Sequence, residues 1–376
     1  MKIYIEGSSF YGKRTGVGRY SLNVSQQLSV LRPKDGFVVF SFLRPFRTIV
    51  KDFTFGKNVS FSFIRIFPGR VFSILMRNGI SLPLNLFGIG RADVLIFPNF
   101  ISWASLTRKK RICIIHDVAY LYYPEYIQDK NLKYLRKQLP KSLHRSARIA
   151  TVSEATKQDL VKEFSVDPDK ISIVHNAVDQ KTFNPQAVTQ APAVRKKYQL
   201  PVKYILYVGT VEPRKNIVGL IEAYAQSYDK HGCALVVAGG NGWNLEKIEA
   251  AFAKHADLPI FRLDYVADID LPALYAGAQL FVFPSYYEGF GLPVLEAMAV
   301  GCPVVCSNTS SLPEIVGSAA VMVAPDDIDE LAMQMQLVIG NQQKRQQLID
   351  AGFKQARNFT WQHSAHQLSD IIDAVS

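Results

Sequence analysis

The sequence predicts an α/β protein with doubly wound parallel sheets, and two observations support this prediction. Short runs of Val, Ile, Leu and Phe recur along the chain without alternating with polar residues, as strands buried on both faces of a parallel sheet require. Patterns with helical spacing follow these runs, such as the apolar set Val17, Tyr20, Val24 and Leu28. Strands that alternate with helices are typical of a sheet covered by helices on both faces.

The strand-like runs fall into two groups along the chain. The first half contains "KIYIEG", "FVVFSF", "DVLIFP", "RICIIHD" and "ARIATVS", and the second half contains "KYILYVG", "ALVVAGG", "QLFVFPS" and "PVVCSN". Helices are expected over 16–31 after a glycine-rich turn, after Asn216 as an N-cap, and after Thr360. Pro293 and Gly301 are expected to begin and end a further helix.

The length of the chain favours two domains. Its 376 residues exceed what one ordinary hydrophobic core organises. The prolines and mixed polar residues of "DQKTFNPQAVTQAPAVRKKYQL" indicate a linker. We therefore expect a first domain over 1–186, a linker over 187–198 and a second domain over 199–355.

Several features indicate a cytoplasmic protein. The first ten residues lack the apolar region of a secretory signal, and the longest apolar region is broken by Arg77, Asn78 and Pro83, so no membrane span is expected. The four cysteines show neither Cys-x-x-Cys spacing nor clustered histidines, which argues against a zinc site or a disulfide framework. A reducing compartment fits this cysteine pattern.

The net charge of +11 is unevenly distributed. Residues 1–186 hold 29 Lys and Arg against 13 Asp and Glu, a net +16, whereas residues 187–376 hold 14 against 19, a net −5. A basic half implies an anionic partner, either nucleic acid or a phospholipid surface. Arg stands beside aromatic residues in "FLRPFRT" and "FSFIRIFPGRVFSILMR", which favours the membrane surface. An ordinary solvated positive face is the alternative interpretation.

Charged residues follow two of the predicted strands of the second half. Arg214 and Lys215 stand just before a predicted helix, and two cations beside a helix N-terminus suit a diphosphate group without any metal. Glu288 and Glu296 are the only charged residues over 281–305. Because ligands bind beyond the carboxyl ends of parallel strands, we expect these carboxylates to accept hydrogen bonds from the hydroxyls of a sugar nucleotide. A solvated Arg–Lys pair and a Glu296 that pairs within the fold are the alternatives.

These motifs, in this order, resemble those of the retaining GT-B glycosyltransferases of family 4, which includes sucrose synthases and bacterial mannosyltransferases. The resemblance rests on "EGFGLPVLEAMAVGCPVV" and "GTVEPRKN" and extends through "GVGRY", "IHD", "VSEATKQDL", "VHNAVD" and "LPALYAGAQLFVFPS". It implies two Rossmann-like domains that face each other across a cleft, the first binding an acceptor and the second a nucleotide sugar. It also implies a C-terminal helix over 356–376 that packs back on the first domain.

The resemblance assigns a role to each matching residue. The implied catalytic residues are His116 near the transferred sugar, Glu288 beside the donor sugar, and Arg214 and Lys215 at the leaving diphosphate. The implied donor-binding residues are Gly16, Gly18, Gly209, Arg214, Lys215, Gly289, Phe290, Gly291, Leu292 and Glu296, of which Glu296 holds the ribose hydroxyls. Arg19, Asp117 and Ser153 are expected on the acceptor side.

The chemistry of such a reaction is consistent with these residue types. Breaking a sugar–phosphate bond develops positive charge on the sugar and negative charge on the diphosphate, so preorganised cations and carboxylates lower the barrier. The resemblance implies that the anomeric configuration is retained by attack on the same face. A covalent intermediate with Glu288 as the nucleophile is the alternative, and the sequence does not choose between them.

The resemblance also implies particular substrates. "GVGRY" and "IHD" are most similar to enzymes that add mannose-type sugars to bacterial surface polysaccharides, which implies GDP-mannose or GDP-rhamnose as the donor. The basic first domain suits a polyprenyl-diphosphate-linked saccharide acceptor at the inner face of the cytoplasmic membrane, in O-antigen or capsule assembly. Neither a cofactor nor a metal is expected. The "DID" of Asp268–Asp270 is similar to the metal motif of the other main glycosyltransferase fold, but its position favours Asp270 as a helix cap.

Other functions explain fewer of these residues. A sugar-nucleotide epimerase or phosphorylase on the same fold is the nearest alternative. A dinucleotide oxidoreductase fits less well, because Ser21 stands where a Gly-x-Gly-x-x-Gly motif needs its third glycine. A non-catalytic protein that binds nucleic acid or a membrane surface would explain the basic half but not Glu288, Glu296 or the Arg214–Lys215 pair. No nucleic-acid partner is therefore expected.

Overall fold

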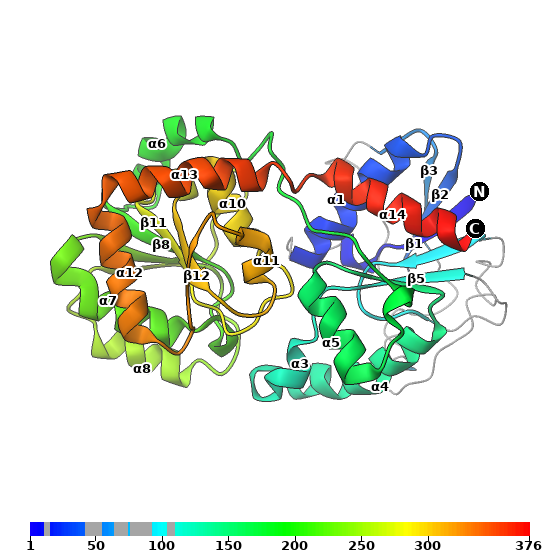
Figure 1. The fold of residues 1–376 in the computed structure, drawn as a ribbon, viewed down its shortest axis with the longest axis horizontal. Coiled ribbons are helices and arrows are strands. Elements are labelled where there is room, and N and C mark those ends of the chain that lie inside the picture. Colours follow the sequence, from blue (N-terminus) through cyan, green and yellow to red (C-terminus); the bar gives the residue numbers. More distant parts are fainter. Residues whose placement is uncertain (11–15, 42–54, 64–73, 76–91, 104–109) are drawn as a thin grey trace. The chain divides into compact units, whose positions relative to one another are not determined.

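The computed structural model describes residues 1–10, 16–41, 55–63, 74–75, 92–103 and 110–376. The chain folds into two compact units. Unit 1 comprises Met1–Tyr122, Ile127–Asn176 and Trp361–Ser376, and unit 2 comprises Tyr123–Tyr126 and Ala177–Thr360 (Figure 1). The chain thus leaves unit 1 after Asn176 and returns to it at Trp361.

Unit 1 is built on a parallel sheet whose described strands run in the order β3-β2-β1-β4-β5-β6-β7. These strands are β1 (Lys2–Glu6), β2 (Gly36–Ser41), β3 (Val59–Phe63), β4 (Val94–Phe97), β5 (Lys110–Ile115), β6 (Arg148–Thr151) and β7 (Ile171–Ile173). Its described helices are η1 (Ser8–Phe10), α1 (Gly16–Leu31), α3 (Ala119–Tyr122), α4 (Asp129–Arg145), α5 (Glu154–Phe164), η6 (Pro168–Lys170) and α14 (Trp361–Val375). Strand β4 and residues 112–115 of β5 are buried, which explains their apolar sequence, whereas β5 begins with the exposed Lys110 and the half-buried Arg111.

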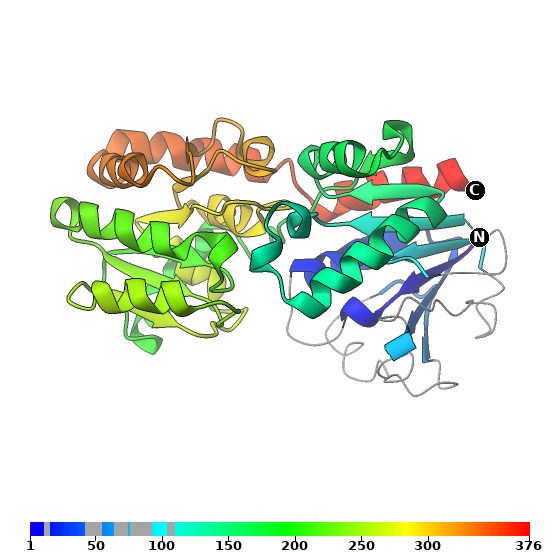
Figure 2. The same cartoon turned by 90° about the horizontal axis from the view of Figure 1, so that it is seen from below.

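Helices α1 and α14 come from opposite ends of the chain and lie side by side in unit 1 (Figures 1 and 2). Tyr20 of α1 packs against Trp361 of α14, with ring centroids 6.1 Å apart. Arg32, directly after α1, forms an ion pair with Asp373 at 2.8 Å. The last helix therefore completes the apolar packing of unit 1.

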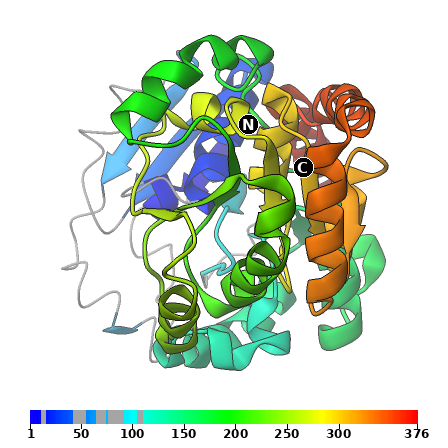
Figure 3. The same cartoon turned by 90° about the vertical axis from the view of Figure 1, so that its left-hand side faces the viewer.

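Unit 2 is built on a second parallel sheet, with the strand order β10-β9-β8-β11-β12-β13. These strands are β8 (Tyr204–Val208), β9 (Ala234–Ala238), β10 (Ile260–Leu263), β11 (Leu280–Phe283), β12 (Val304–Ser307) and β13 (Val321–Val323). Its helices, which surround the strands in Figure 3, are η5 (Pro124–Tyr126), η7 (Pro185–Gln190), α6 (Ala191–Lys197), η8 (Pro213–Lys215), α7 (Ile217–His231), α8 (Glu246–Lys254), α9 (Leu271–Ala276), α10 (Leu292–Val300), α11 (Leu312–Val316), α12 (Ile328–Gly340) and α13 (Gln342–Ala356). The two parallel sheets confirm the predicted α/β class.

The segment assigned to a linker from its prolines is largely helical in the structure. Residues 185–197 form η7 and α6, which pack against α9 within unit 2. Ala191 and Val194 are buried because their spacing of three places both on one face of the helix. Prolines at the first turns of η7 and α6 begin these helices and do not prevent them.

Two glycines let the ends of β8 and β9 approach each other. Gly209 and Gly239 directly follow these strands, and a Cβ atom at position 239 would lie 1.8 Å from the carbonyl oxygen of Gly209. No side chain fits at such a distance, so only glycine is tolerated at position 239. This close approach fixes the start of the loop that carries Arg214 and Lys215.

Candidate active site

The loop between β8 and α7 is anchored by Asn216. This residue adopts a left-handed conformation with φ of 55° and is the N-cap of α7, as the sequence predicts. Its side-chain oxygen accepts a hydrogen bond from the Gly219 N–H at 3.2 Å, and its Nδ2 donates to the Pro325 carbonyl at 2.7 Å. Arg214 and Lys215 precede it in the single turn η8 and are thereby held at the carboxyl end of β8.

Four charged side chains form a buried cluster at this edge of the sheet. The Lys215 Nζ lies 2.5 Å from Glu288 Oε1. A guanidinium nitrogen of Arg214 lies 2.6 Å from Glu212 Oε1, and the other lies 3.5 Å from Glu288 Oε2. The exposed fractions of these side chains range from 3% to 16%. Two cations and two carboxylates therefore balance each other where they are largely shielded from bulk water.

The charges of the cluster set the protonation of Glu288. Burial alone would raise the pKa of this carboxyl group, but the positive charges of Lys215 and Arg214 outweigh burial and keep its pKa below the usual value. Burial lowers the pKa of Lys215, and the negative charge of Glu288 opposes this shift. The two groups form an ion pair. The sequence motifs favoured a ligand as the partner of Glu288, whereas the structure shows this protein partner.

The loop that carries Glu288 is fixed through its backbone. The Glu288 N–H donates to Ser310 Oγ at 2.8 Å, and Ser311 Oγ donates to the Glu288 carbonyl at 2.8 Å. The Tyr286 N–H donates to the Arg214 carbonyl at 3.0 Å. The sequence analysis did not identify Ser310 or Ser311 as site residues. Both belong to the polar residues that follow the strand-like run "PVVCSN", and polar residues at the end of a parallel strand are candidates for a site.

Glu296 lies on α10 and has a partner of its own. Its Oε2 accepts a hydrogen bond from the Tyr275 hydroxyl of α9 at 3.1 Å. The Tyr275 ring contacts Phe281, Phe281 stacks on Phe283, and Lys215 Nζ lies 5.2 Å from the centre of the Phe283 ring. A row of aromatic rings thus connects Glu296 to the ion cluster.

The remaining donor-binding candidates of unit 2 lie at the start of α10. Gly291 is the N-cap of this helix, with φ of 105°, and Leu292 is its first residue, one position before the expected Pro293. Gly289 and Phe290 precede them, and the Phe290 ring packs edge-on against Phe359. Gly301 ends the helix in a left-handed conformation, as the sequence predicts.

In unit 1, His116 directly follows β5 and is buried. Its Nε2 lies 2.7 Å from the Pro98 carbonyl, and its ring packs edge-on against Tyr20 of α1 at a centroid distance of 5.0 Å. A carbonyl oxygen only accepts hydrogen bonds, so Nε2 carries the proton and Nδ1 is the acceptor of the neutral ring. Burial lowers the pKa of His116, which keeps the imidazole neutral.

The other unit 1 candidates lie at the starts of helices. Gly16 and Gly18 fall in the first turn of α1, with Arg19 next to them. The Asp117 carboxylate accepts a hydrogen bond from the Ala119 N–H at 3.1 Å. Ser153 is the buried N-cap of α5 and accepts from the Thr156 N–H, so this predicted acceptor-side hydroxyl has a structural role.

Asp270 precedes α9 at its N-cap position, but its side chain does not cap the helix. Its Oδ2 instead accepts hydrogen bonds from Lys197 Nζ at 2.6 Å and from the Tyr198 hydroxyl at 2.8 Å.

Across the part of the chain that the structure describes, no three His, Cys, Asp or Glu side chains are grouped as a metal site requires. Likewise, none of the described helices has the length and apolar composition needed to cross a bilayer.

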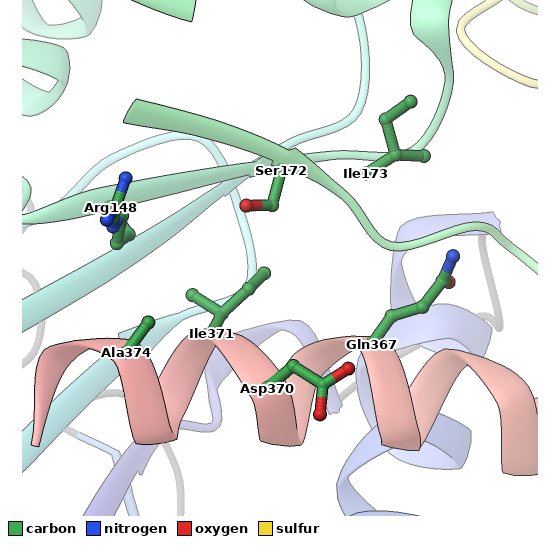
Figure 4. Close-up of a pocket in the computed structure, with 7 residues that line it drawn as sticks. All are labelled: Arg148, Ser172, Ile173, Gln367, Asp370, Ile371 and Ala374. Atoms are coloured by element: carbon green, nitrogen blue, oxygen red, sulfur yellow. The ribbon is translucent and has the colours of Figure 1, made fainter. Parts of the chain in front are cut away.

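A surface hollow of about 400 Å³ lies elsewhere in unit 1, between β6, β7 and α14 (Figure 4). Ile371 and Ala374 of α14 face Ser172 of β7 across it, with Arg148 at one end. Its lining residues differ from those predicted for the reaction, so we do not assign it to the candidate active site.

Two family models together match most of the chain. The model for glycosyltransferase family 4 matches residues 15–182, and the model for glycosyl transferases group 1 matches residues 191–355. The O-antigen chain mannosyltransferase B of Escherichia coli is 31% identical over 391 residues, which cover 98% of each chain. The O-antigen chain mannosyltransferase RfbU of Salmonella typhimurium is 31% identical over 217 residues, covering 57% of this chain and 56% of the relative.

Solved structures share the whole architecture. Sucrose-phosphate synthase from Thermosynechococcus elongatus matches 100% of this chain and 98% of its own, with a TM-score of 0.74 and 18% identity. WaaG, a glycosyltransferase involved in lipopolysaccharide biosynthesis, matches 99% of both chains with a TM-score of 0.72 and 16% identity. These matches confirm the GT-B fold, and the family models confirm the resemblance stated from the sequence. The chain belongs to glycosyltransferase family 4.

Proposed function

We propose that this enzyme transfers a mannose-type hexose from a GDP-linked donor to a lipid-linked saccharide acceptor in O-antigen synthesis, with retention of configuration. The buried cluster of Lys215, Arg214, Glu212 and Glu288 carries the proposal. The full-length similarity to an O-antigen chain mannosyltransferase supports the sugar and the process. The rhamnose-type donor is the second candidate within the same class.

In this proposal, unit 2 binds the nucleotide sugar. Lys215 and Arg214 stabilise the negative charge that develops on the leaving diphosphate, and their orientation is fixed before the donor binds. Glu288 lies beside the donor sugar, and Glu296 binds the ribose hydroxyls. The glycines at 209, 289 and 291 bring backbone N–H groups close to the donor. No metal takes part in this assignment.

In the same proposal, unit 1 supplies His116 and the acceptor site. Because Nε2 of His116 is committed to the Pro98 carbonyl, Nδ1 is the atom that can accept a hydrogen bond from a sugar hydroxyl. A neutral imidazole places no positive charge beside a sugar that becomes cationic in the transition state. Gly16, Gly18 and Arg19 at the start of α1 are assigned to the donor diphosphate and the acceptor.

Thermal unfolding with a panel of nucleotide sugars tests the donor. A ligand that binds only the folded protein raises the melting temperature, so GDP-mannose or GDP-rhamnose should raise it more than UDP-, dTDP- or ADP-sugars. Glu296→Ala should weaken this response, whereas Glu249→Ala, which removes a surface partner of Arg262, should not. A response to no nucleotide sugar would contradict the proposed reaction, and a response to UDP-sugars alone would contradict the GDP-linked donor.

We also propose that the basic part of unit 1 binds the anionic inner face of the cytoplasmic membrane. The segments "FLRPFRT" and "FSFIRIFPGRVFSILMR", on which the sequence prediction rested, fall mostly outside the described residues. Helix α4 supports the proposal, because its 17 residues include six Lys and Arg against the single carboxylate of Asp129. Lys130, Lys133 and Arg136 are exposed, and each cation near such a surface contributes about 1 kcal/mol.

Vesicles containing phosphatidylserine should bind the full chain and release it as the salt concentration rises. The triple substitution Lys130→Gln, Lys133→Gln and Arg136→Gln should weaken binding by at least roughly tenfold.

The matched control removes the same charge from unit 2, through Lys344→Gln, Lys354→Gln and Arg357→Gln on and beside α13. It should bind vesicles as the unmodified protein does. Equal loss of binding in both triple variants would show that only the net charge matters and would contradict a membrane site on α4.

A further inference from the structure

Glu212 is a buried carboxylate to which the sequence motifs assign no role. Its side chain is only 3% exposed, and it lies in the loop between β8 and η8. The backbone beside it is fixed, because the Val211 N–H donates to the Gly240 carbonyl and the Gly242 N–H donates to the Val211 carbonyl. A Cβ atom at Gly242 would lie 3.1 Å from Glu212 Cβ, so the two loops are in close contact. Glu212 therefore has little freedom to move.

Arg214 connects this loop to the loop that carries Glu288. Its guanidinium group donates to Glu212 Oε1 at 2.6 Å and to the Tyr287 carbonyl at 2.5 Å. Its own carbonyl accepts from the Tyr286 N–H. A buried guanidinium group needs a counter-charge, and Glu212 supplies it at the side away from Glu288. The direction of Arg214 thus depends on Glu212.

We propose that Glu212 is a positioning residue for the transfer reaction, a step that rests on the proposed function. By holding Arg214 against the segment Tyr286–Glu288, it keeps the Glu288 carboxylate beside Lys215, where the donor binds. Its negative charge also balances the cluster before an anionic diphosphate arrives. Glu212 itself does not contact the donor in this proposal.

This role has two opposite consequences when the charge of Glu212 is removed. In Glu212→Gln the amide can still accept a hydrogen bond from Arg214, but the cluster gains a net positive charge. An anionic nucleoside diphosphate should then bind more tightly, because the uncompensated cation attracts it. Transfer should become slower, because an uncharged amide holds the Arg214 guanidinium group less firmly than a carboxylate does, and because the leaving diphosphate is bound in the ground state as strongly as in the transition state.

The test measures GDP affinity and turnover of GDP-mannose by the full chain. Glu212→Gln should lower the Kd of GDP by roughly threefold or more and lower kcat by roughly tenfold or more. Glu212→Asp retains the charge with a shorter side chain. Its Kd for GDP should therefore equal that of the unmodified protein, and its kcat should lie between those of the unmodified protein and Glu212→Gln. Glu222→Gln is the matched control, because Glu222 pairs with Lys254 and His255 on the surface of the same unit and should change neither value.

The outcomes separate this inference from the function on which it rests. If Glu212 only supports the fold, Glu212→Gln should lower the melting temperature and weaken GDP binding together, which would overturn the positioning role. The positioning role would also be overturned if Glu212→Gln, like Glu222→Gln, changed neither the Kd of GDP nor kcat. If the unmodified protein binds no nucleotide and turns over no nucleotide sugar, the proposed donor reaction fails instead.

Discussion

Replacing Lys215 by Met should lower the rate of sugar transfer by roughly a thousandfold at saturating donor. The substitution removes the cation closest to Glu288 and one of the two that are proposed to stabilise the leaving diphosphate. It also leaves Glu288 buried without its nearest counter-charge, and breaking a buried pair in this way costs about 3–5 kcal/mol of folding free energy. Steady-state kinetics and urea unfolding measure the two effects.

The pH dependence of this variant follows from the pKa of Glu288. In the unmodified protein the pKa of Glu288 is lowered, so the pair stabilises the fold above the usual carboxyl pKa and loses this contribution as the pH falls through the folded-state value. Without Lys215 the pKa of Glu288 should rise, and the variant should be least stable at alkaline pH. Lys254→Met, which breaks the exposed pair with Glu222, should change stability by about 0.5 kcal/mol and leave kcat unchanged. Normal turnover by Lys215→Met would contradict its role at the diphosphate.

Replacing Glu6 by Gln should stabilise the protein by roughly 3 kcal/mol at pH 8 and by little at pH 5. Glu6 ends β1, is 4% exposed, and accepts a hydrogen bond from the Ser8 N–H at 2.8 Å. Burial raises the pKa of Glu6 from 4.5 to about 7. Between pH 4.5 and about 7, Glu6 is protonated in the folded protein but ionised in the unfolded chain. The protein therefore has its full stability below pH 4.5, and the ionisation of Glu6 lowers the free energy of unfolding as the pH rises through 7.

Urea unfolding of both proteins between pH 5 and pH 8 checks this prediction. The Gln side chain can still accept the Ser8 hydrogen bond, so the difference in unfolding free energy should report the charge of Glu6. Asp370→Asn, on the exposed surface of α14, is the control and should give no comparable pH-dependent gain. A difference between Glu6→Gln and the unmodified protein that stays constant with pH would show that burial does not perturb Glu6.

The sequence predicted the central strands of both sheets and missed the four at the edges. The strands β3, β7, β10 and β13 flank their sheets. The first three contain Ser or Arg within the strand, and β13 is only three residues long with Met322 exposed. An edge strand packs against fewer neighbours and is partly exposed, so its side chains need not be uniformly apolar. A strand that is buried on both faces can be recognised in a single sequence from its continuous apolar residues. Edge strands are not buried on both faces, so this signal is weaker in them.

The candidate site was predictable in part for a similar reason. Lys215 and Glu288 follow β8 and β11, which are neighbours in the sheet, so their proximity follows from strand order. The partners Glu212, Ser310 and Tyr275 were not predictable, because their contacts depend on loop and helix geometry that residue spacing does not encode. The helical segment at 185–197 was missed because proline can indicate either a linker or the first turn of a helix.

The arrangement of the chain in unit 1 affects the order in which the protein can fold during its synthesis. The core of unit 1 includes Trp361 packed against Tyr20, and the ion pair between Arg32 and Asp373 joins the same two helical segments at the surface. Residues 1–176 therefore leave the ribosome long before the helix that completes their packing exists, whereas unit 2 gains almost all of its chain without interruption. We expect the later unit to become stable first, the reverse of the usual N-terminal-first order, and a nascent chain stopped before residue 361 should leave unit 1 sensitive to proteases.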